Sequence, residues 1–256
     1  MPMRDELGER MKRYEQVSDG MLAIKTPVII RIDGNAFHTF TKGFNKPFDK
    51  NFIEAMTATC EDLCKDISGC QYGFVQSDEI SLFLCDYEKI ETQPWFDYRI
   101  QKLASIAAAK ATWFFNKHLN EEYEKAKAEN PHSTITIFLG EKIKKMACFD
   151  ARAFNIPKDE ISNYFIWRQN DAIRNAILSV AQLVMPSSEL MNKNIKQLKS
   201  ILTDKYNVQF EGIPSRCLRG TFISKEYDPD KCKKVWITDK ETPDFKEHRE
   251  ILEEFS

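Results

Sequence analysis

Two aspartates that follow predicted strands have the residue type and spacing of a metal site. Asp33 ends the run TPVIIRIDG, residues 26–34, and Asp78 lies between the apolar parts of YGFVQSDEISLFL, residues 72–84. Two carboxylates on adjacent backbone suit Mg²⁺, which takes one or two carboxylates together with waters and substrate phosphates. A pair of such ions binds the attacking and leaving oxygens of a phosphoryl transfer.

Both segments also have a plain structural interpretation. A DG pair after a strand is usually a turn, and SDE between strands is usually a polar bend. The bend contains neither Gly nor Asn, so it lacks the usual chemistry of a tight hairpin, which slightly favours the metal site. Gly34 lets the backbone approach a ligand, and its carbonyl is a further candidate ligand. Spacing alone leaves both interpretations open.

The first half of the chain predicts the elements that would position the aspartates. A helix with one apolar stripe begins near Phe52, strands follow over 71–76 and 79–85, and a long helix covers about 94–118. After a polar connection, TITIFL and MACFDARAFNIP resemble strands. This order is the ferredoxin-like split βαβ pattern. We expect the first strand beside the strand after the first helix, so that its end lies near the turn between strands two and three.

The later residues predict more helix. One helix covers ISNYFIWRQNDAIRNAILSVAQLVM, a second covers MNKNIKQLKSILTDKY, and RCLRGTFIS with KKVWIT predicts a short hairpin. The predicted fold class is therefore α+β, a ferredoxin-like split βαβ domain with an appended helical C-terminal part. We expect a catalytic domain over 1–156 and a C-terminal part over 157–256 packed on it.

Composition limits the class of protein. The 256 residues are 42% hydrophobic and carry a net charge of −2, which excludes binding of nucleic acid through overall positive charge. Local clusters such as Lys142, Lys144 and Lys145 are expected to be solvated faces. The N-terminus lacks the apolar region of a signal peptide, and no apolar stretch is long enough to span a bilayer. We expect a cytoplasmic protein with no membrane partner and with reduced cysteines in its core.

Four segments follow each other along the chain: RIDGNAFHTF, FNKPFD, YGFVQSDEISLFL and YFIWRQNDAIRN. In this order they resemble the motifs of the tRNA(His) guanylyltransferase family of 3′–5′ nucleotide polymerases. The match runs from about Val28 to Thr221. It implies a catalytic domain similar to the palm of ordinary polymerases, which agrees with the strand order above. It also implies two Mg²⁺ ions, tRNA, ATP and GTP or other NTPs as partners, and a homotetramer.

The resemblance also implies roles for individual residues. Asp33 and Asp78 would be catalytic and would bind metal together with the Gly34 carbonyl, while Glu79 has no assigned role because facing alternates along a strand. The implied nucleotide contacts are Asp33, Gly34, Asn35, Ala36, Phe37, His38, Lys46, Ser77, Asp78 and Lys102. The implied contacts to tRNA or to a second phosphate are Arg152, Arg168, Asp171 and Asn175.

One motif departs from the family pattern. Family members that add G₋₁ to tRNA(His) carry a His-Ile-Asn-Asn stretch shortly after WRQxD, whereas this chain has Ile173, Arg174, Asn175 and Ala176. The departure favours the branch of the family that restores nucleotides to 5′-truncated tRNAs by template pairing. Addition of G₋₁ to tRNA(His) is the alternative within the family.

Two hypotheses from other classes of protein function stay open. A nucleotide cyclase would give a cyclic product without RNA, and a non-catalytic tRNA- or nucleotide-binding module would bind without turnover.

For two side chains outside the motifs we predict only whether they are buried or exposed. Trp167 is expected in the core, and His118 is expected on the surface because no other residues complete a site around it.

Overall fold

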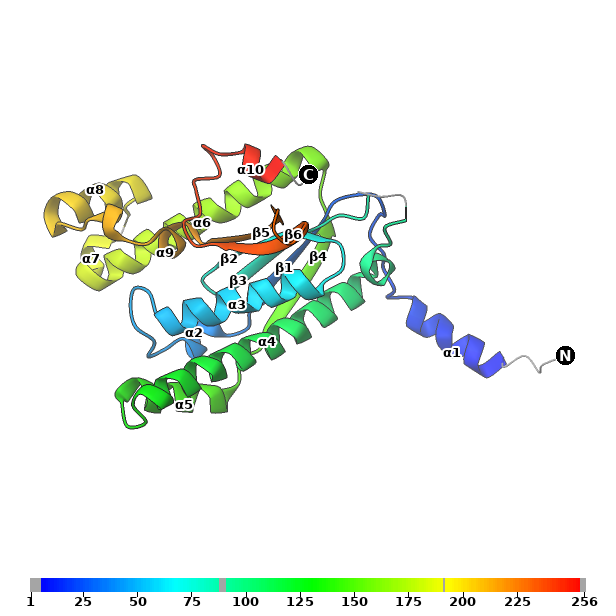
Figure 1. Cartoon of the computed structure of the whole chain (residues 1–256), viewed down its shortest axis with the longest axis horizontal. Helices are drawn as coiled ribbons and strands as arrows, with labels where there is room; N and C mark the ends of the chain where they lie inside the picture. Colours follow the sequence, from blue (N-terminus) through cyan, green and yellow to red (C-terminus); the bar gives the residue numbers. More distant parts are fainter. Residues whose placement is uncertain (1–5, 88–90, 191, 254–256) are drawn as a thin grey trace.

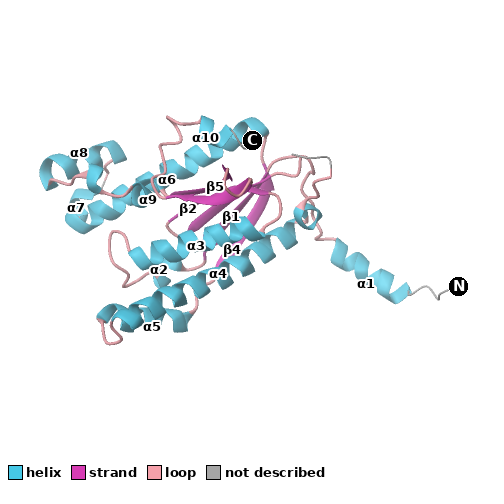
Figure 2. Ribbon diagram, in the orientation of Figure 1, coloured by secondary structure: helices cyan, strands magenta, loops and turns pink. Residues whose placement is uncertain are grey.

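A computed structural model gives the structure of the chain and describes residues 6–87, 91–190 and 192–253. The described residues form a six-stranded sheet in the order β4–β1–β3–β2–β5–β6, and every pair of neighbours is antiparallel (Figures 1 and 2). The strands are β1 Val28–Gly34, β2 Cys70–Gln76, β3 Glu79–Leu84, β4 Phe149–Asn155, β5 Thr221–Asp228 and β6 Lys233–Asp239.

The predicted split βαβ order is confirmed. The chain runs through β1, α3 (Lys50–Asp66), β2, β3, α4 (Ile100–Glu129) and β4. The expected neighbour of the first strand is wrong, because β1 lies between β3 and β4, and β2 lies beyond β3. The crossover through α3 leaves a gap between β1 and β2, and the tight turn after β2 folds β3 back into it.

Both faces of the sheet are buried. Along β1, Val28, Ile30 and Ile32 belong to the core that α3 and α4 cover, whereas Ile29 belongs to the core under α6 (Ile161–Val184). Figure 1 shows α3 and α4 on one side of the sheet and α6 on the other. Alternate side chains of a strand point to opposite faces, so a strand covered on both faces has the continuous apolar run seen in the sequence.

The C-terminal part builds on the same sheet. The predicted hairpin is confirmed as β5 and β6, and β5 pairs with β2. Part of the predicted hairpin segment is instead the helix α9 (Ser215–Arg219). The second half of α6 packs on α8 (Ile195–Tyr206) and the 3₁₀ turn η3 (Phe210–Gly212), through a cluster that includes Ile177, Val180, Leu198, Leu202 and Phe210. The domain boundary at residue 156 stays a prediction.

One predicted strand is wrong. TITIFL belongs to the helix α5, Thr134–Lys145. The Ser133 hydroxyl accepts a hydrogen bond from the Thr136 N–H at 3.1 Å and so caps the helix. Leu139 and Lys142, three residues apart, are both buried on one side of it. The alternation of Thr and Ile imitates a strand, but the N-cap and the burial at helical spacing determine the structure.

The bounds of the long helix were also mispredicted. It ends at Glu129 rather than 118, because the polar stretch after 118 consists mainly of good helix formers. It begins at Ile100 rather than 94, because η1 (Trp95–Tyr98) precedes it with left-handed backbone at Phe96 and Asp97.

Three side chains lie where the sequence did not place them. His118 is buried, with one ring nitrogen 2.8 Å from Asp62 and the other 2.8 Å from Glu121. The amine of Lys142 is buried among phenylalanine rings and donates to the Lys42 carbonyl at 2.7 Å, so it is no solvated residue. Trp167 is 53% exposed and is not a core residue.

The other described helices are short. They are α1 Glu6–Gln16, α2 Phe37–Phe40, η2 Lys158–Glu160, α7 Ser187–Leu190 and α10 Glu250–Glu253. None of the helices in the described ranges is both long and apolar enough to cross a membrane.

Gly73 provides a test of the packing between β2 and α3. A Cβ at this position would lie 2.5 Å from the Cys64 Sγ and 2.9 Å from the Cys60 Sγ. We expect Gly73→Ala to lower the free energy of unfolding by about 1–3 kcal/mol, because overpacking forces a buried neighbour to move. Urea denaturation measures the loss.

Gly212→Ala is the matched control, because a Cβ there has no atom within 4 Å. It should change the free energy of unfolding by less than about 0.5 kcal/mol. Equal stability of the two variants would contradict the tight packing around Gly73.

Candidate active site

Asp33 and Asp78 meet at one end of the sheet. β1 and β3 pair so that Asp33 faces Glu79, and the Gly34 N–H donates to the Asp78 carbonyl at 3.1 Å. The turn between β2 and β3 consists of Ser77 and Asp78, and Ser77 has left-handed backbone with φ 49°. Such a backbone is uncommon outside glycine and marks a position that its surroundings hold in place. The sequence correctly predicted the convergence, although β3 rather than β2 is the adjacent strand.

Asp78 has an environment that disfavours its negative charge. Burial raises the pKa of Asp78, hydrogen bonds from the backbone and Ser77 oppose this shift, and the nearby charge of Asp33 adds to it. A cation between the two carboxylates would offset both burial and repulsion. The electrostatics of the apo site therefore suit a bound metal ion.

The loop after Asp33 is anchored to the core by an aromatic ring. Phe37 is buried and packs against the rings of Phe40, Phe52, Phe115 and Phe149. A Cβ on Gly34 would lie 2.3 Å from the Phe37 ring, so the close approach requires glycine. The backbone beside the carboxylates is therefore held against a fixed ring.

This packing restricts how the predicted nucleotide loop can bind. The Phe37 side chain faces the core and is not placed to contact a nucleotide. The Asn35 N–H donates to the Cys148 carbonyl at 2.8 Å, so it does not serve a phosphate. Ala36 has left-handed backbone and His38 is exposed. Of this loop, the Asn35 side chain, Ala36, the Phe37 backbone and His38 stay predicted contacts.

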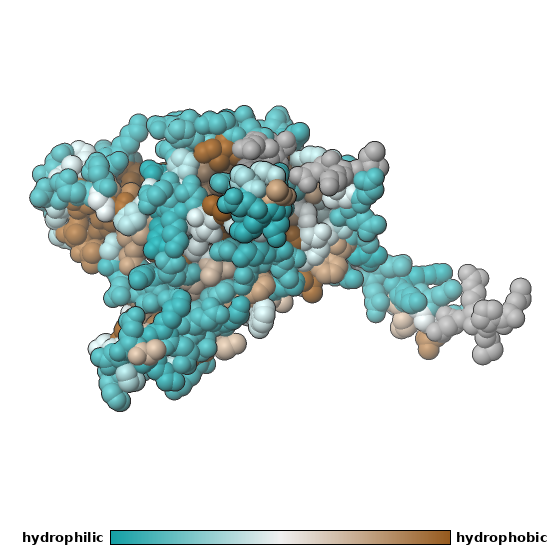
Figure 3. All heavy atoms as spheres, viewed as in Figure 1, coloured by the Kyte–Doolittle hydropathy of each residue, from teal (hydrophilic) through white to brown (hydrophobic). Residues whose placement is uncertain are grey.

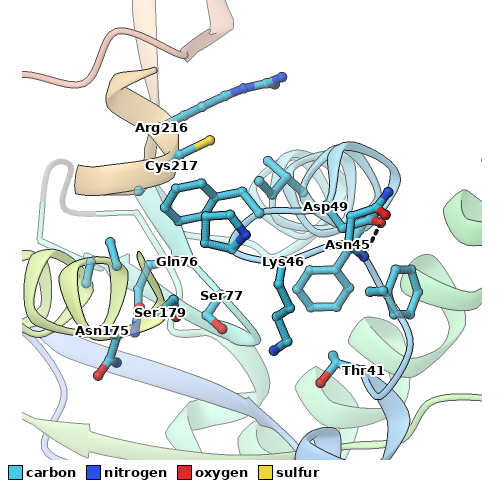
Figure 4. A pocket seen from close by; sticks show the side chains of 18 residues that line it. Thr41, Asn45, Lys46, Asp49, Gln76, Ser77, Asn175, Ser179, Arg216 and Cys217 are labelled. Carbon is cyan, nitrogen blue, oxygen red and sulfur yellow. Dashed lines mark hydrogen bonds between the residues drawn. The ribbon is translucent and has the colours of Figure 1, made fainter. Parts of the chain in front are cut away.

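A cavity of about 160 Å³ opens beside Ser77. Its walls come from the loop before α3, the end of β2, α6 and α9, and its polar side chains include Thr41, Asn45, Lys46, Gln76, Asn175, Ser179 and Arg216. Figure 4 shows the Lys46 amine between the hydroxyls of Ser77 and Thr41. Phe44, Pro47, Phe48, Phe52 and Ala176 give it an apolar part. An apolar pocket with a few polar groups is typical of a small-molecule site.

Lys46, Ser77 and Asn175, predicted from the sequence as nucleotide or tRNA contacts, all line this cavity. The contribution of α9 to the cavity wall was not predicted. Arg216 and Cys217 line it from about 140 residues beyond Asp78. Nothing in their local sequence indicates that position, because β5 must first pair with β2 to bring α9 there.

Glu79 has a partner that the sequence did not indicate. The Arg168 Nε donates to Glu79 Oε1 at 2.6 Å, and Nη2 donates to Oε2 at 2.9 Å. Nη2 also donates to Asp171 at 2.9 Å, and Asn175 donates to Asp171 at 3.4 Å. Burial raises the pKa of Glu79, and the charges of Arg168 and Arg31 oppose that shift.

This network corrects the expected role of Arg168. Arg168 is only 4% exposed, and its guanidinium is bound by two carboxylates, so it is not placed to bind a phosphate. Asp171 accepts from the same guanidinium. Arg168 therefore holds the Glu79 carboxylate, whereas Asp171 is 28% exposed and stays a predicted contact. Asn175 lines the cavity and stays a predicted contact.

One predicted phosphate contact, Lys102, lies away from the carboxylates. The Thr112 hydroxyl on α4 accepts a hydrogen bond from the Phe149 N–H. Phe149 belongs to β4 and pairs with Gly34 of β1. Lys102 lies ten residues earlier on α4, which is about 15 Å along the helix axis, and its amine lies over the Phe96 ring. A single chain therefore does not bring Lys102 to Asp33, and a nucleotide contact there would need a separate site. Arg152 is exposed on the edge strand β4, 3.8 Å from Asp150, which pairs with Asp33 of β1, and it stays a predicted contact.

The donor set available for a metal is small. Among the described residues, no group of three or more His, Cys, Asp or Glu side chains is placed to hold an ion. Asp33, Asp78 and the Gly34 carbonyl offer only hard oxygens. This set fits Mg²⁺, which keeps several waters and takes further oxygens from substrate phosphates.

The family model for tRNAHis guanylyltransferase matches residues 8–157. The chain belongs to the tRNAHis guanylyltransferase family. It is therefore a nucleotidyltransferase that acts on tRNA. Enzymes of this family generally depend on a metal ion. The predicted family and the predicted palm-like α+β fold are confirmed.

Individual relatives agree with the family. A probable tRNA(His) guanylyltransferase of Dictyostelium discoideum is 24% identical over 260 residues, which cover 96% of this chain and 93% of the relative. A bacterial tRNA(His) guanylyltransferase-like protein solved with ATP is 39% identical with a TM-score of 0.84, covering 98% of each chain. A structure of such a bacterial protein with GTP is 38% identical with a TM-score of 0.81, covering 98% of this chain and 99% of the other.

Breaking the Glu79–Arg168 ion pair should destabilise the fold. We expect Arg168→Met to lower the free energy of unfolding by about 3–5 kcal/mol, because it leaves the buried Glu79 carboxylate with only Arg31, 4.0 Å away. Arg249→Met is the control, because Arg249 forms an exposed pair with Glu253 at 2.8 Å, and such pairs contribute at most about 1 kcal/mol. Thermal and urea unfolding measure both losses.

The double variant Glu79→Met/Arg168→Met separates charge burial from lost packing. Removing both charges should cost less than Arg168→Met alone, because no unpaired carboxylate remains. A double variant less stable than the single variant would show that the ion pair is not the main contribution.

Proposed function

We propose that this chain adds nucleotides to the 5′ end of tRNA in the 3′–5′ direction and thereby repairs 5′-truncated tRNAs. The observation that carries the proposal is the convergence of Asp33 and Asp78 beside a cavity that holds Lys46. The ATP and GTP complexes of bacterial relatives, at 39% and 38% identity, support a nucleoside triphosphate as the ligand of this cavity.

The chain's own residues suit this ligand. Asp33, Asp78 and the Gly34 carbonyl would hold two Mg²⁺ ions together with phosphate oxygens and water. Such ions, when bound, lower the pKa of an attacking hydroxyl and neutralise the charge of a leaving group. Lys46 would bind phosphate as a point charge next to the Ser77 hydroxyl, and the apolar part of the cavity would receive the base.

The proposed reaction has two steps. First, an oxygen of the tRNA 5′-monophosphate attacks the α-phosphorus of ATP or GTP, and pyrophosphate leaves. Second, the 3′-hydroxyl of an incoming NTP loses its proton and attacks the activated 5′-phosphorus, and the nucleoside monophosphate leaves. The product has one new phosphodiester bond and a 5′-triphosphate. In both steps the protein positions the reactants and stabilises charge.

The cavity supports repair rather than G₋₁ addition. Ile173 and Ala176 occupy positions where the G₋₁-adding members carry His and Asn. In this structure Ile173 packs with the helical cluster around α8, and Ala176 forms part of the apolar wall of the cavity. Two polar groups of the specific pattern are therefore absent from these positions. A site with fewer base-specific contacts suits selection of the nucleotide by pairing with the template.

We also propose a cytoplasmic homotetramer. The net charge of −2 gives a single chain no overall attraction for tRNA. Basic clusters gathered from several copies would provide the local positive surface that phosphates require.

The central prediction is template-directed extension. Wild-type protein with Mg²⁺ and NTPs should extend a 5′-truncated tRNA, and Asp78→Ala should lower the rate roughly 1,000-fold or more, because it removes a metal ligand at the reacting centre. Sequencing gels of the products read the added nucleotides. Circular dichroism should show an unchanged fold for the variant.

Other outcomes would select the alternatives. Full activity in EDTA would contradict the metal site. Salt-dependent tRNA binding without turnover would indicate a binding module, and a cyclic product from NTP alone would indicate a cyclase. A single G added to tRNA(His) only would indicate G₋₁ addition instead of repair.

Lys46 provides a test of the cavity. We expect Lys46→Met to raise the KM for the NTP roughly 10- to 100-fold, because a charge-assisted hydrogen bond to phosphate is lost. The control is Lys50→Met, since Lys50 is exposed at the start of α3 and does not line the cavity. Steady-state kinetics over a range of NTP concentrations measure both variants. Equal KM values for the two variants would place the triphosphate elsewhere.

A further inference from the structure

Trp167 is an exposed ring beside the candidate site. It is 53% exposed, although hydrophilic residues dominate the face of the molecule shown in Figure 3. The indole lies over the Arg168 guanidinium, whose central carbon is 4.2 Å from the ring centroid. Arg168 binds Glu79, and Glu79 pairs with Asp33 across β1 and β3. A short series of contacts therefore connects the indole to the strand end that carries Asp33.

The neighbouring side chains hold the indole in a fixed position. The Tyr164 ring packs against it at 5.8 Å with an interplanar angle of 66°, and the Tyr164 hydroxyl lies 3.0 Å from the Ser81 hydroxyl of β3. The guanidinium on the other side is itself bound by two carboxylates. Since the guanidinium covers one face of the indole, the exposed area belongs mainly to the opposite face. A rigid ring with one free face binds a flat partner at a small cost in conformational entropy.

The indole borders a part of the sheet that α6 leaves open. Residues directly opposite each other on antiparallel strands share a face of the sheet. Across β1 and β4, Arg31 lies opposite Arg152, and Asp33 lies opposite Asp150. All four lie on the α6 face, because along β1 they alternate with Ile32 of the opposite core. The side chains of Arg152 and Asp150 are 56% and 58% exposed, so these four residues form an open surface, the β4 shelf.

Trp167 forms a wall of the β4 shelf. It lies three residues after Tyr164 and seven before Arg174, so the three side chains share one flank of α6. This flank faces β4, because the Phe154 ring of β4 packs on Tyr164 at 5.9 Å. Arg174 is 61% exposed and continues the wall beyond the indole. The shelf and this wall together make one surface that leads to Asp33.

The charges around the shelf favour a nucleobase over a phosphate. Arg152 lies 3.8 Å from Asp150, and Arg174 lies 3.7 Å from Asp171, so each exposed arginine has a carboxylate beside it. A surface without net positive charge attracts the phosphates of a duplex only weakly. An indole stacks on the flat face that every nucleobase has. Bases inside a duplex already stack on one another, so the occupant that fits this surface is an unpaired base.

We propose that Trp167 stacks on an unpaired base of the tRNA 3′ strand and holds the template strand beside Asp33. This inference rests on the proposed function. A tRNA that has lost 5′ nucleotides leaves their partners on the 3′ strand unpaired, and these partners must lie next to the reacting 5′ end to select the incoming nucleotide. Stacking tolerates any base, so one ring serves tRNAs of different sequence.

The test compares two exposed tryptophans. Trp167→Ala should raise the KM for a 5′-truncated tRNA roughly 5- to 100-fold, because one stack between a base and an aromatic ring is lost. The KM for the NTP should stay near wild type, and Trp167→Phe should keep most of the tRNA affinity because a phenyl ring still stacks. Steady-state kinetics measure both constants, and thermal unfolding should show that the variants stay folded.

Trp113→Ala is the matched control. Trp113 is 62% exposed and has the Lys117 amine 5.9 Å from its ring centroid, but it belongs to α4 on the opposite side of the sheet (Figure 1). This variant should keep the wild-type KM for tRNA. Equal KM values for tRNA in Trp167→Ala and Trp113→Ala would overturn the proposal. A change in Trp167→Ala that is confined to the KM for the NTP would overturn it as well.

Abasic nucleotides test the stack from the side of the RNA. Each unpaired nucleotide of the 3′ strand is made abasic in turn, and binding of the truncated tRNA is measured without NTP by fluorescence anisotropy. At one position the abasic tRNA should bind wild type as weakly as Trp167→Ala binds the intact tRNA, and the two changes together should cause no further loss. Losses that multiply at every position would overturn the stack.

Binding and extension separate this inference from the proposed repair. Binding that depends on Trp167, without extension of the tRNA, would contradict the repair and support the stack. Extension with the same tRNA affinity in wild type and Trp167→Ala would overturn the stack and leave the repair in place.

Discussion

The geometry of the candidate site depends on the buried ion pair between Glu79 and Arg168. Glu79 begins β3 directly after Asp78 and faces Asp33 across the sheet, whereas Arg168 belongs to α6 on the covering layer. The two hydrogen bonds of this pair, at 2.6 and 2.9 Å, connect the strand ends to the helix. A buried pair of this kind adds little net stability compared with apolar packing, but loss of one partner is costly. Its main effect here is to fix position.

That position matters because α6 continues from the sheet to the cavity. Its first half packs on the sheet through Ile161 and Phe165, and the turns after Arg168 bring Ala172, Asn175, Ala176 and Ser179 to the cavity wall. The ion pair therefore sets the distance between the turn that carries Asp78 and the wall that faces Lys46. The two halves of the site come from distant parts of the sequence, and one pair of side chains fixes their position relative to each other.

Local pattern predicted those parts of the fold in which neighbouring residues determine the structure. The strands around Asp33 and Asp78 are apolar on both faces, and their order with α3 and α4 gives the split βαβ arrangement. Local sequence pattern gave a wrong prediction where contacts with other parts of the chain determine the structure. TITIFL has the period of a strand, yet the Ser133 cap and the burial of Leu139 make it a helix. In the sequence Lys142 resembles a surface lysine, but in the structure its amine donates a hydrogen bond to the Lys42 carbonyl of a distant loop.

The same distinction separates the predictable half of the site from the rest. Asp33 and Asp78 follow adjacent strands, so topology alone brings them together. Arg168 is polar and lies on a helix, which suggests an exposed phosphate contact, and only the packed structure shows that Glu79 occupies it. This division has an electrostatic logic. Arg168 neutralises Glu79, so the charge left uncompensated at this end of the sheet belongs to Asp33 and Asp78. Burial of Asp78 and the nearby charge of Asp33 disfavour the ionised form of Asp78, and a bound cation would relieve that cost.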